Sequence, residues 1–151
     1  MTEFTSPEIE NLETDDYYGL DDGTMRESAE ALRDRVVGRR IVKAEKIDEV
    51  SERHRWYATD NTFKITLDDG TEVDMVGVGD CCAFTQLEDF WLDPNSIDHV
   101  ITGVGTTDEF DTWHIYADFG DIMRLTVNWS CGNPFYYGYG FDITVVPNKE
   151  Q

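Results

Sequence analysis

The sequence predicts an α+β domain, in which one N-terminal amphipathic helix packs on a mainly antiparallel sheet of six or seven strands. Two observations predict this class. Apolar residues recur about every 3.6 positions over residues 24–36, and from residue 40 onward they recur at every second position. Glycine-bearing turn sequences separate the alternating segments, and tight turns join antiparallel neighbours. The alternative is a partly closed β-barrel, in which the same strands curl on themselves.

The helix is predicted to begin at Thr24, because the Thr24 hydroxyl and the Glu27 carboxylate can each cover a free backbone amide in a capping box. Gly38 suits the left-handed residue that ends a helix. The apolar residues between them form one stripe, which consists of Met25, Ala29, Leu32 and Val36. Arginines gather at the C-terminal end, where the helix dipole favours cations, and we interpret them as a solvated face: Arg33, Arg35, Arg39 and Arg40.

Alternating segments predict the strands, which are residues 40–47, 56–67, 73–78, 97–103, 113–119, 123–129 and 135–145. Asp69-Gly70 is predicted to form a two-residue type I′ turn, and Gly120-Asp121 a type II′ turn. In the last segment, Gly138 and Gly140 indicate that the strand bends or is closely approached by another backbone.

The chain is strongly acidic, with 32 Asp and Glu against 12 Lys and Arg and a formal net charge of −20. Such a charge keeps a small domain soluble, repels nucleic acid and anionic membranes, and attracts basic surfaces. Residues 1–23 are predicted to form an acidic arm, residues 24–147 a single domain and residues 148–151 a tail. We therefore expect a protein partner with a basic surface, and neither direct nucleic-acid binding nor membrane binding.

The sequence also bears on the compartment. It contains no apolar run long enough to span a membrane, and its first residues lack the basic and apolar regions of a signal peptide. Its three cysteines do not form an even framework of spaced disulfide bonds. We therefore expect a cytoplasmic protein.

Two segments are candidate binding regions. In the acidic arm, apolar residues spaced among carboxylates are typical of a segment that docks on another surface. The arm candidates are Asp15, Asp16, Tyr17, Tyr18, Asp21 and Asp22. In the aromatic-rich stretch 135–141, alternation assigns most rings to the core but leaves Tyr136 on the opposite face. An exposed tyrosine is a good interface anchor, so Tyr136 is a further candidate.

The sequence Asp80-Cys81-Cys82 is the most unusual local feature. Residues 84–91 are predicted to form a short helix after it, because their large apolar residues fall on one helical stripe. A thiol at a helix N-terminus has a lowered pKa, which would make Cys81 or Cys82 reactive. The carboxylate of Asp80 opposes this effect, and no histidine is adjacent, so packing of free thiols is the preferred interpretation.

The sequence contains no nucleophile motif and no closely spaced pair of cysteines or histidines of the kind that zinc sites use. We therefore assign no catalytic residue, no metal and no cofactor, and expect a protein that is not an enzyme.

Several motifs in order resemble an uncharacterised domain family of bacteriophages of actinobacteria and their hosts. They are Gly38-Arg39-Arg40-Ile41, Leu67-Asp68-Asp69-Gly70-Thr71, Gly79-Asp80-Cys81-Cys82, Trp113-His114-Ile115-Tyr116 and residues 133–141. The similarity covers about residues 35–146, and its Asp-Cys-Cys motif is the most specific part. The resemblance implies a phage or prophage accessory protein in the bacterial host, with no established activity, cofactor or catalytic residue.

The leading hypothesis is a non-enzymatic, phage-encoded accessory protein that binds a host or phage protein through an acidic, aromatic-bearing surface. One alternative is a DNA mimic, whose carboxylates would follow phosphate-like spacing on one face to occupy a nucleic-acid-binding protein. Another is a thiol-dependent or metal-dependent activity at Cys81 and Cys82. A structural component of the virion is the fourth possibility.

Overall fold

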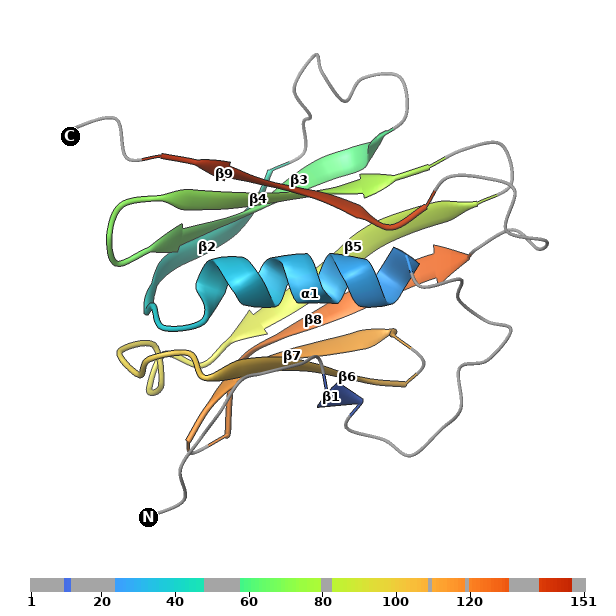
Figure 1. The fold of residues 1–151 in the computed structure, drawn as a ribbon. Helices are drawn as coiled ribbons and strands as arrows, with labels where there is room; N and C mark the ends of the chain where they lie inside the picture. The colour runs from blue at the N-terminus through green and yellow to red at the C-terminus, as the bar shows by residue number, and fades with distance from the viewer. Residues whose placement is uncertain are drawn as a thin grey trace.

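The computed structural model describes residues 10–11, 24–47, 58–79, 83–108, 110–118, 120–130 and 139–147. Within these ranges, one helix and the strands of two sheets form an α+β fold, as predicted. The strands lie in two sheets, whereas the sequence predicted one, and the described strands do not close into a barrel. Helix α1 (Thr24–Val36) lies between the sheets and contacts strand β9 of one and strand β6 of the other (Figure 1).

The four-stranded sheet has the order β2-β3-β4-β9, with antiparallel pairing throughout. Its strands are β2 (Ile41–Ile47), β3 (Ala58–Leu67), β4 (Glu72–Val78) and β9 (Phe141–Val146). Alternation buries Phe63, Ile65, Val73 and Met75 on one face. Alternation from Phe141 places Val145 on the core face, but Val145 is 38% exposed on β9, an edge strand.

The five-stranded sheet has the order β1-β6-β7-β8-β5. Its strands are β1 (Glu10–Asn11), β5 (Phe84–Leu92), β6 (Gly103–Thr107), β7 (Thr112–Ala117) and β8 (Gly120–Ser130). The β1–β6 pair is parallel and the other pairs are antiparallel. The predicted core face of β7 and β8 is confirmed, because Trp113, Ile115, Met123 and Leu125 are fully buried.

Helix α1 begins at the predicted residue and buries the predicted stripe completely. Gly38 follows it with a φ of +88°, the left-handed conformation expected there. Two hydrogen bonds join the chain after the helix to the segment just before β6. Gly38 N–H donates to the Ile101 carbonyl, and Ile101 N–H donates to the Arg39 carbonyl, each at 2.9 Å. At 13 residues, α1 is too short to traverse a lipid bilayer, and no other helix occurs in the described ranges.

The first turn of α1 packs directly on the start of β9. Ser28 Oγ donates to the Thr24 carbonyl at 3.0 Å and accepts the Phe141 N–H at 3.1 Å. Gly140 has a φ of +99°, and a Cβ at this position would lie 2.6 Å from Thr24 Cγ2. The close approach therefore comes from side chains of the helix, whereas the sequence predicted a backbone, and the nearest backbone atom is the Thr24 carbonyl oxygen at 3.9 Å.

The predicted helix over residues 84–91 is wrong, because these residues form β5. A register shift between Leu87 and Asp89 marks a β-bulge in the pairing with β8. The bulge inserts one residue, so that Leu87 packs in the core and Phe90, three positions later, packs on Phe63 with ring centroids 4.9 Å apart. The three residues of the predicted helical stripe do not share a face, because Leu87 is buried whereas Phe84 and Trp91 are exposed.

The predicted strand over residues 97–103 is also wrong, because residues 94–99 form turns and β6 begins only at Gly103. The Asp93 side chain accounts for the turns. Its Oδ1 accepts the Asn95 N–H at 2.9 Å, and its Oδ2 accepts the Ser96 hydroxyl at 3.0 Å. These local hydrogen bonds compete with strand pairing, which is the usual effect of aspartate in a turn.

Both predicted two-residue turns are wrong in their geometry. Gly70 has a φ of +88° but Asp69 has a negative φ, whereas a type I′ turn needs positive values at both. Gly70 N–H donates to the Leu67 carbonyl and Leu67 N–H to the Thr71 carbonyl, each at 2.9 Å, which gives a three-residue loop. Gly120 pairs with Ala117, so that Gly120-Asp121 belongs to β8 and not to the preceding turn.

Helix and sheets share one hydrophobic core. Trp113 lies at its centre, where its ring meets Phe141 of the other sheet at 5.3 Å in a T-shaped arrangement. The indole N–H donates to the buried Phe110 carbonyl at 2.9 Å. The two sheets are therefore packed as one unit.

Candidate functional site

All residues that the sequence singled out as candidates lie outside the described residues: Asp15, Asp16, Tyr17, Tyr18, Asp21, Asp22, Cys81, Cys82 and Tyr136. Residues 84–92 after the cysteines form a strand, so the helix N-terminus proposed to activate a thiol is not there. In the described residues, no three His, Cys, Asp or Glu side chains converge on a point that could hold a metal ion.

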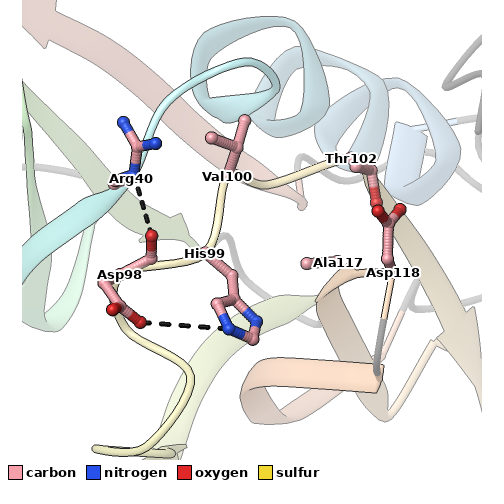
Figure 2. Close-up of a pocket in the computed structure, with 7 residues that line it drawn as sticks. All are labelled: Arg40, Asp98, His99, Val100, Thr102, Ala117 and Asp118. Carbon is pink, nitrogen blue, oxygen red and sulfur yellow. Dashed lines mark hydrogen bonds and ion pairs between the residues drawn. The ribbon is translucent and has the colours of Figure 1, made fainter.

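A surface pocket of about 330 Å³ lies beside the connection between α1 and β2 (Figure 2). It is lined by Arg40, Asp98, His99, Val100, Thr102, Ala117 and Asp118. Arg40 Nε donates to the Asp98 carbonyl at 2.8 Å, and its guanidinium pairs with Asp68 at 3.6 Å. Because the arginine is already paired and Asp118 adds negative charge, the pocket offers no net attraction for an anion.

The five-stranded sheet has a second candidate surface, its face opposite the core, which we call the outer face. Strand pairing places Trp91, Arg124, His114 and Gly105 in one row across β5, β8, β7 and β6. Trp91 is 45% exposed, and the Arg124 guanidinium lies over its ring at 4.7 Å from the centroid. A cation at this distance is attracted by the ring, so the contact orders both side chains.

A chain of hydrogen bonds crosses the outer face. Thr107 Oγ1 on β6 lies 2.8 Å from His114 Nε2 on β7, and His114 Nδ1 lies 2.8 Å from Asp121 Oδ2 on β8. Arg124 Nε donates to the same oxygen of Asp121 at 2.7 Å. The chain therefore continues through Arg124 to Trp91, and it connects side chains of four adjacent strands.

Sequence reasoning missed this chain, and a bulge explains why. Strict alternation from Met123 and Leu125 would place Asp121 on the core face. The register shifts between Ile115 and Tyr116, so that Ile122 and Met123 are both buried. The shift turns Asp121 onto the outer face with Arg124. Alternation alone places His114 on the outer face, and this position was the one indication of the hydrogen-bond chain in the sequence.

Charge is divided between parts of the molecule. Between residues 65 and 148 the sequence has 15 Asp and Glu but a single Lys or Arg, which is Arg124. Arginines instead gather on α1 and on the segment that follows it. On β5, exposed Glu88 and Asp89 lie between two exposed aromatic residues, Phe84 and Trp91. Among the described residues, the outer face is thus acidic with aromatic groups. Arg124 is the one Lys or Arg on its strands and pairs with Asp121, and the Lys46 ammonium of β2 donates to the Glu88 carbonyl at 2.8 Å.

The corresponding face of the four-stranded sheet is more evenly charged. Lys64 Nζ lies 3.2 Å from Asp74 and 3.4 Å from Glu72. Burial of the amine favours a lower pKa for Lys64, but the two carboxylates outweigh it and raise the pKa above the usual 10.5. In the neighbouring loop, hydrogen bonds from Thr71 lower the pKa of Asp69. These paired groups stabilise the sheet and its hairpin, and they leave no cluster of like charge.

A family model described as "Domain of unknown function (DUF7448)" matches residues 34–143, so the chain belongs to this family. The prediction of an uncharacterised family is thereby confirmed. The match begins near the end of α1 and includes every strand from β2 to β8, so β5, β6, β7 and β8 of the outer face lie within the family domain and β1 lies outside it. No curated protein and no solved structure matches the chain.

Proposed function

We propose that this member of a family without an assigned activity is a phage-encoded accessory protein that binds a basic surface of a host or phage protein. The outer face of the five-stranded sheet is the proposed binding surface. The observation that carries the proposal is Trp91, an exposed aromatic residue that is held by Arg124 and flanked by carboxylates of β5.

Trp91 has the properties of an interface anchor. Tryptophan and arginine are the residues most enriched among those that dominate binding energy. Here the chain from Asp121 to Arg124 to Trp91 already orders the side chains in the free protein. Less conformational entropy is then lost on binding, because ordering a flexible side chain costs about 0.5–1.5 kcal/mol.

The charge of the face indicates the kind of partner. Exposed Glu88 and Asp89 lie beside Trp91, and Asp121 offsets the only cation of the sheet. Complementary charge accelerates association and excludes partners with acidic surfaces. The surface therefore fits a protein patch rich in Lys and Arg with an apolar recess for the indole.

The outer face supports protein binding better than mimicry of DNA. A mimic needs carboxylates at phosphate-like intervals along a continuous stripe. The central row here consists instead of an indole, a guanidinium, an imidazole and a glycine: Trp91, Arg124, His114 and Gly105. One acidic residue, Glu10 of β1, pairs with Gly105 at the end of this row, and a single carboxylate does not make a stripe.

The test is capture of partners from host lysate by the full-length protein and its variants. We expect a captured protein to be retained by the wild type and lost with Trp91→Ala. Val42→Ala is the matched control, because Val42 is 59% exposed but lies on β2 of the other sheet. Glu88→Gln combined with Asp89→Asn is expected to weaken capture, and salt above physiological strength is expected to do the same.

A second set of variants separates the outer face from the residues predicted in the sequence. One replaces Asp15, Asp16, Asp21 and Asp22 with Asn, another Tyr17 and Tyr18 with Ala, and a third Tyr136 with Ala. Equal capture by the wild type and Trp91→Ala would contradict the outer-face proposal. Loss of capture in the arm variants alone would assign binding to the acidic arm.

A further inference from the structure

Beyond binding, we propose that Thr107, His114 and Asp121 form a nucleophilic site whose hydroxyl accepts an acyl group from activated esters. The three side chains are connected in the order hydroxyl, imidazole, carboxylate, with both intervening distances 2.8 Å. The imidazole uses Nε2 toward the hydroxyl and Nδ1 toward the carboxylate. This is the arrangement in which a general base activates a hydroxyl and a third group orients the base.

The hydrogen-bond partners determine where the protons are. An ionised carboxylate only accepts hydrogen bonds, so His114 Nδ1 must carry a proton to bind Asp121. In the neutral imidazole, Nε2 is then an acceptor, and Thr107 must donate its hydroxyl proton to it. His114 is therefore held in the tautomer that a general base requires.

Arg124 supports this state of the carboxylate. Its Nε donates to Asp121 Oδ2 at 2.7 Å, so the oxygen that faces His114 Nδ1 is held by a second, charge-assisted hydrogen bond. Only 15% of the His114 side chain and 20% of the Asp121 side chain are exposed, so competition from water is reduced. Asp121 and Arg124 are positioning residues here, and His114 is the base.

The strands provide a rigid support for these side chains. Thr107, His114 and Asp121 lie on three adjacent paired strands, and the core faces of β7 and β8 are fully buried beneath them. Groups held on paired strands are positioned more accurately than groups on loops. Gly105 pairs with His114, so the β6 position opposite the imidazole carries no side chain.

The proposed step is an acyl transfer. Thr107 Oγ1 attacks the carbonyl carbon of an activated ester, and its proton passes to His114 Nε2. The bond from the carbonyl carbon to the leaving oxygen breaks, and that oxygen takes the proton from Nε2. The products are an ester of Thr107 and a free phenol or alcohol, with no oxidant or reductant required.

The experiment uses the full-length protein and p-nitrophenyl acetate as the probe. Peptide mass spectrometry measures the rate of acetylation at each threonine, which separates Thr107 from reactive cysteines and lysines. Thr126 is the internal control, because its side chain is exposed on the same face, whereas the hydroxyl that lies against His114 Nε2 is that of Thr107. A general base contributes about 10²–10⁴-fold, so we expect Thr107 to react at least about 100-fold faster than Thr126.

Variants then assign the roles. His114→Gln is expected to bring Thr107 down to the rate of Thr126, and Asp121→Asn to slow it by at least about 10-fold through loss of the required tautomer. Thr107→Ser is expected to react at least as fast as the wild type, because serine lacks the hindering methyl group. Circular dichroism checks that each variant is folded.

The ratio of the Thr107 and Thr126 acetylation rates in the wild type can refute the proposal by itself, even if a variant does not fold. Equal acetylation rates of Thr107 and Thr126 in the folded wild type would show that the hydrogen-bond chain is only structural. An unchanged ratio in folded His114→Gln would show the same.

Discussion

Replacement of Gly140 by alanine tests the contact between α1 and β9. Gly140 has a φ of +99°, which costs an alanine about 1–2 kcal/mol from the backbone alone. The new Cβ would also lie 2.6 Å from Thr24 Cγ2 and 3.1 Å from Ser28 Oγ. Overpacking of this kind costs about 1–3 kcal/mol, so we expect a total destabilisation of about 2–5 kcal/mol.

The neighbours of Gly140 have little freedom to relieve this clash. Thr24 is β-branched, which restricts rotation about its first side-chain torsion. Ser28 Oγ is held by hydrogen bonds to the Thr24 carbonyl and the Phe141 N–H. The Gly140 carbonyl also accepts the Val78 N–H at 2.8 Å, which joins this point to β4. A shift of Gly140 would therefore disturb both the helix and a strand.

Gly38→Ala is the matched control. Gly38 has a φ of +88°, and nothing lies within 4 Å of its added Cβ, so this variant loses only the backbone term of about 1–2 kcal/mol. The assay is urea unfolding followed by tryptophan fluorescence, which reports the buried Trp113. If the two variants differ by less than about 0.5 kcal/mol, the normal scatter of surface substitutions, the proposed clash is absent and the reasoning is refuted.

Two further predictions concern hydrogen bonds. Ser28→Ala removes the acceptor of the buried Phe141 N–H and is expected to cost about 1–3 kcal/mol in urea unfolding, whereas Ser96→Ala at the surface is expected to cost less. Hydrogen bonds from Thr71 lower the folded-state pKa of Asp69 below the ordinary 3.8. The stability that these bonds contribute is therefore present above pH 3.8 and is lost as the pH falls through the lower, folded-state pKa. Unfolding measured from pH 5 to pH 2 is therefore expected to show a shallower acid loss for Asp69→Asn than for the wild type, and equal slopes would contradict this assignment.

Predictions from the local sequence pattern were correct wherever the residues of one helix or strand followed a single period. The helix start, the buried helical stripe and Gly38 follow from capping and from a spacing near 3.6 residues, which depend only on neighbouring residues. The buried faces of β7 and of most of β8 follow from alternation in the same way. These predictions needed no knowledge of which strands are paired.

Bulges explain the main failures. The extra residue near Glu88 interrupts the alternation of β5, and the one near Ile122 moved Asp121 from the expected core face to the outer face. A bulge is defined by two residues opposing one on the partner strand, so it cannot be recognised before the partner is known. The Thr107–His114–Asp121 chain was invisible to sequence reasoning for this reason.

The amino-acid order by itself determined the acidic charge, the α+β class, the capped helix and the core residues of regular strands, because each depends on composition or on contacts between near neighbours. Only the tertiary structure decided that the strands divide into two sheets, that Trp91 is displayed beside Arg124, and that a hydroxyl, an imidazole and a carboxylate meet across three strands. These features depend on pairing between distant segments, and a shift of one residue in that pairing moves a side chain to the opposite face of the sheet.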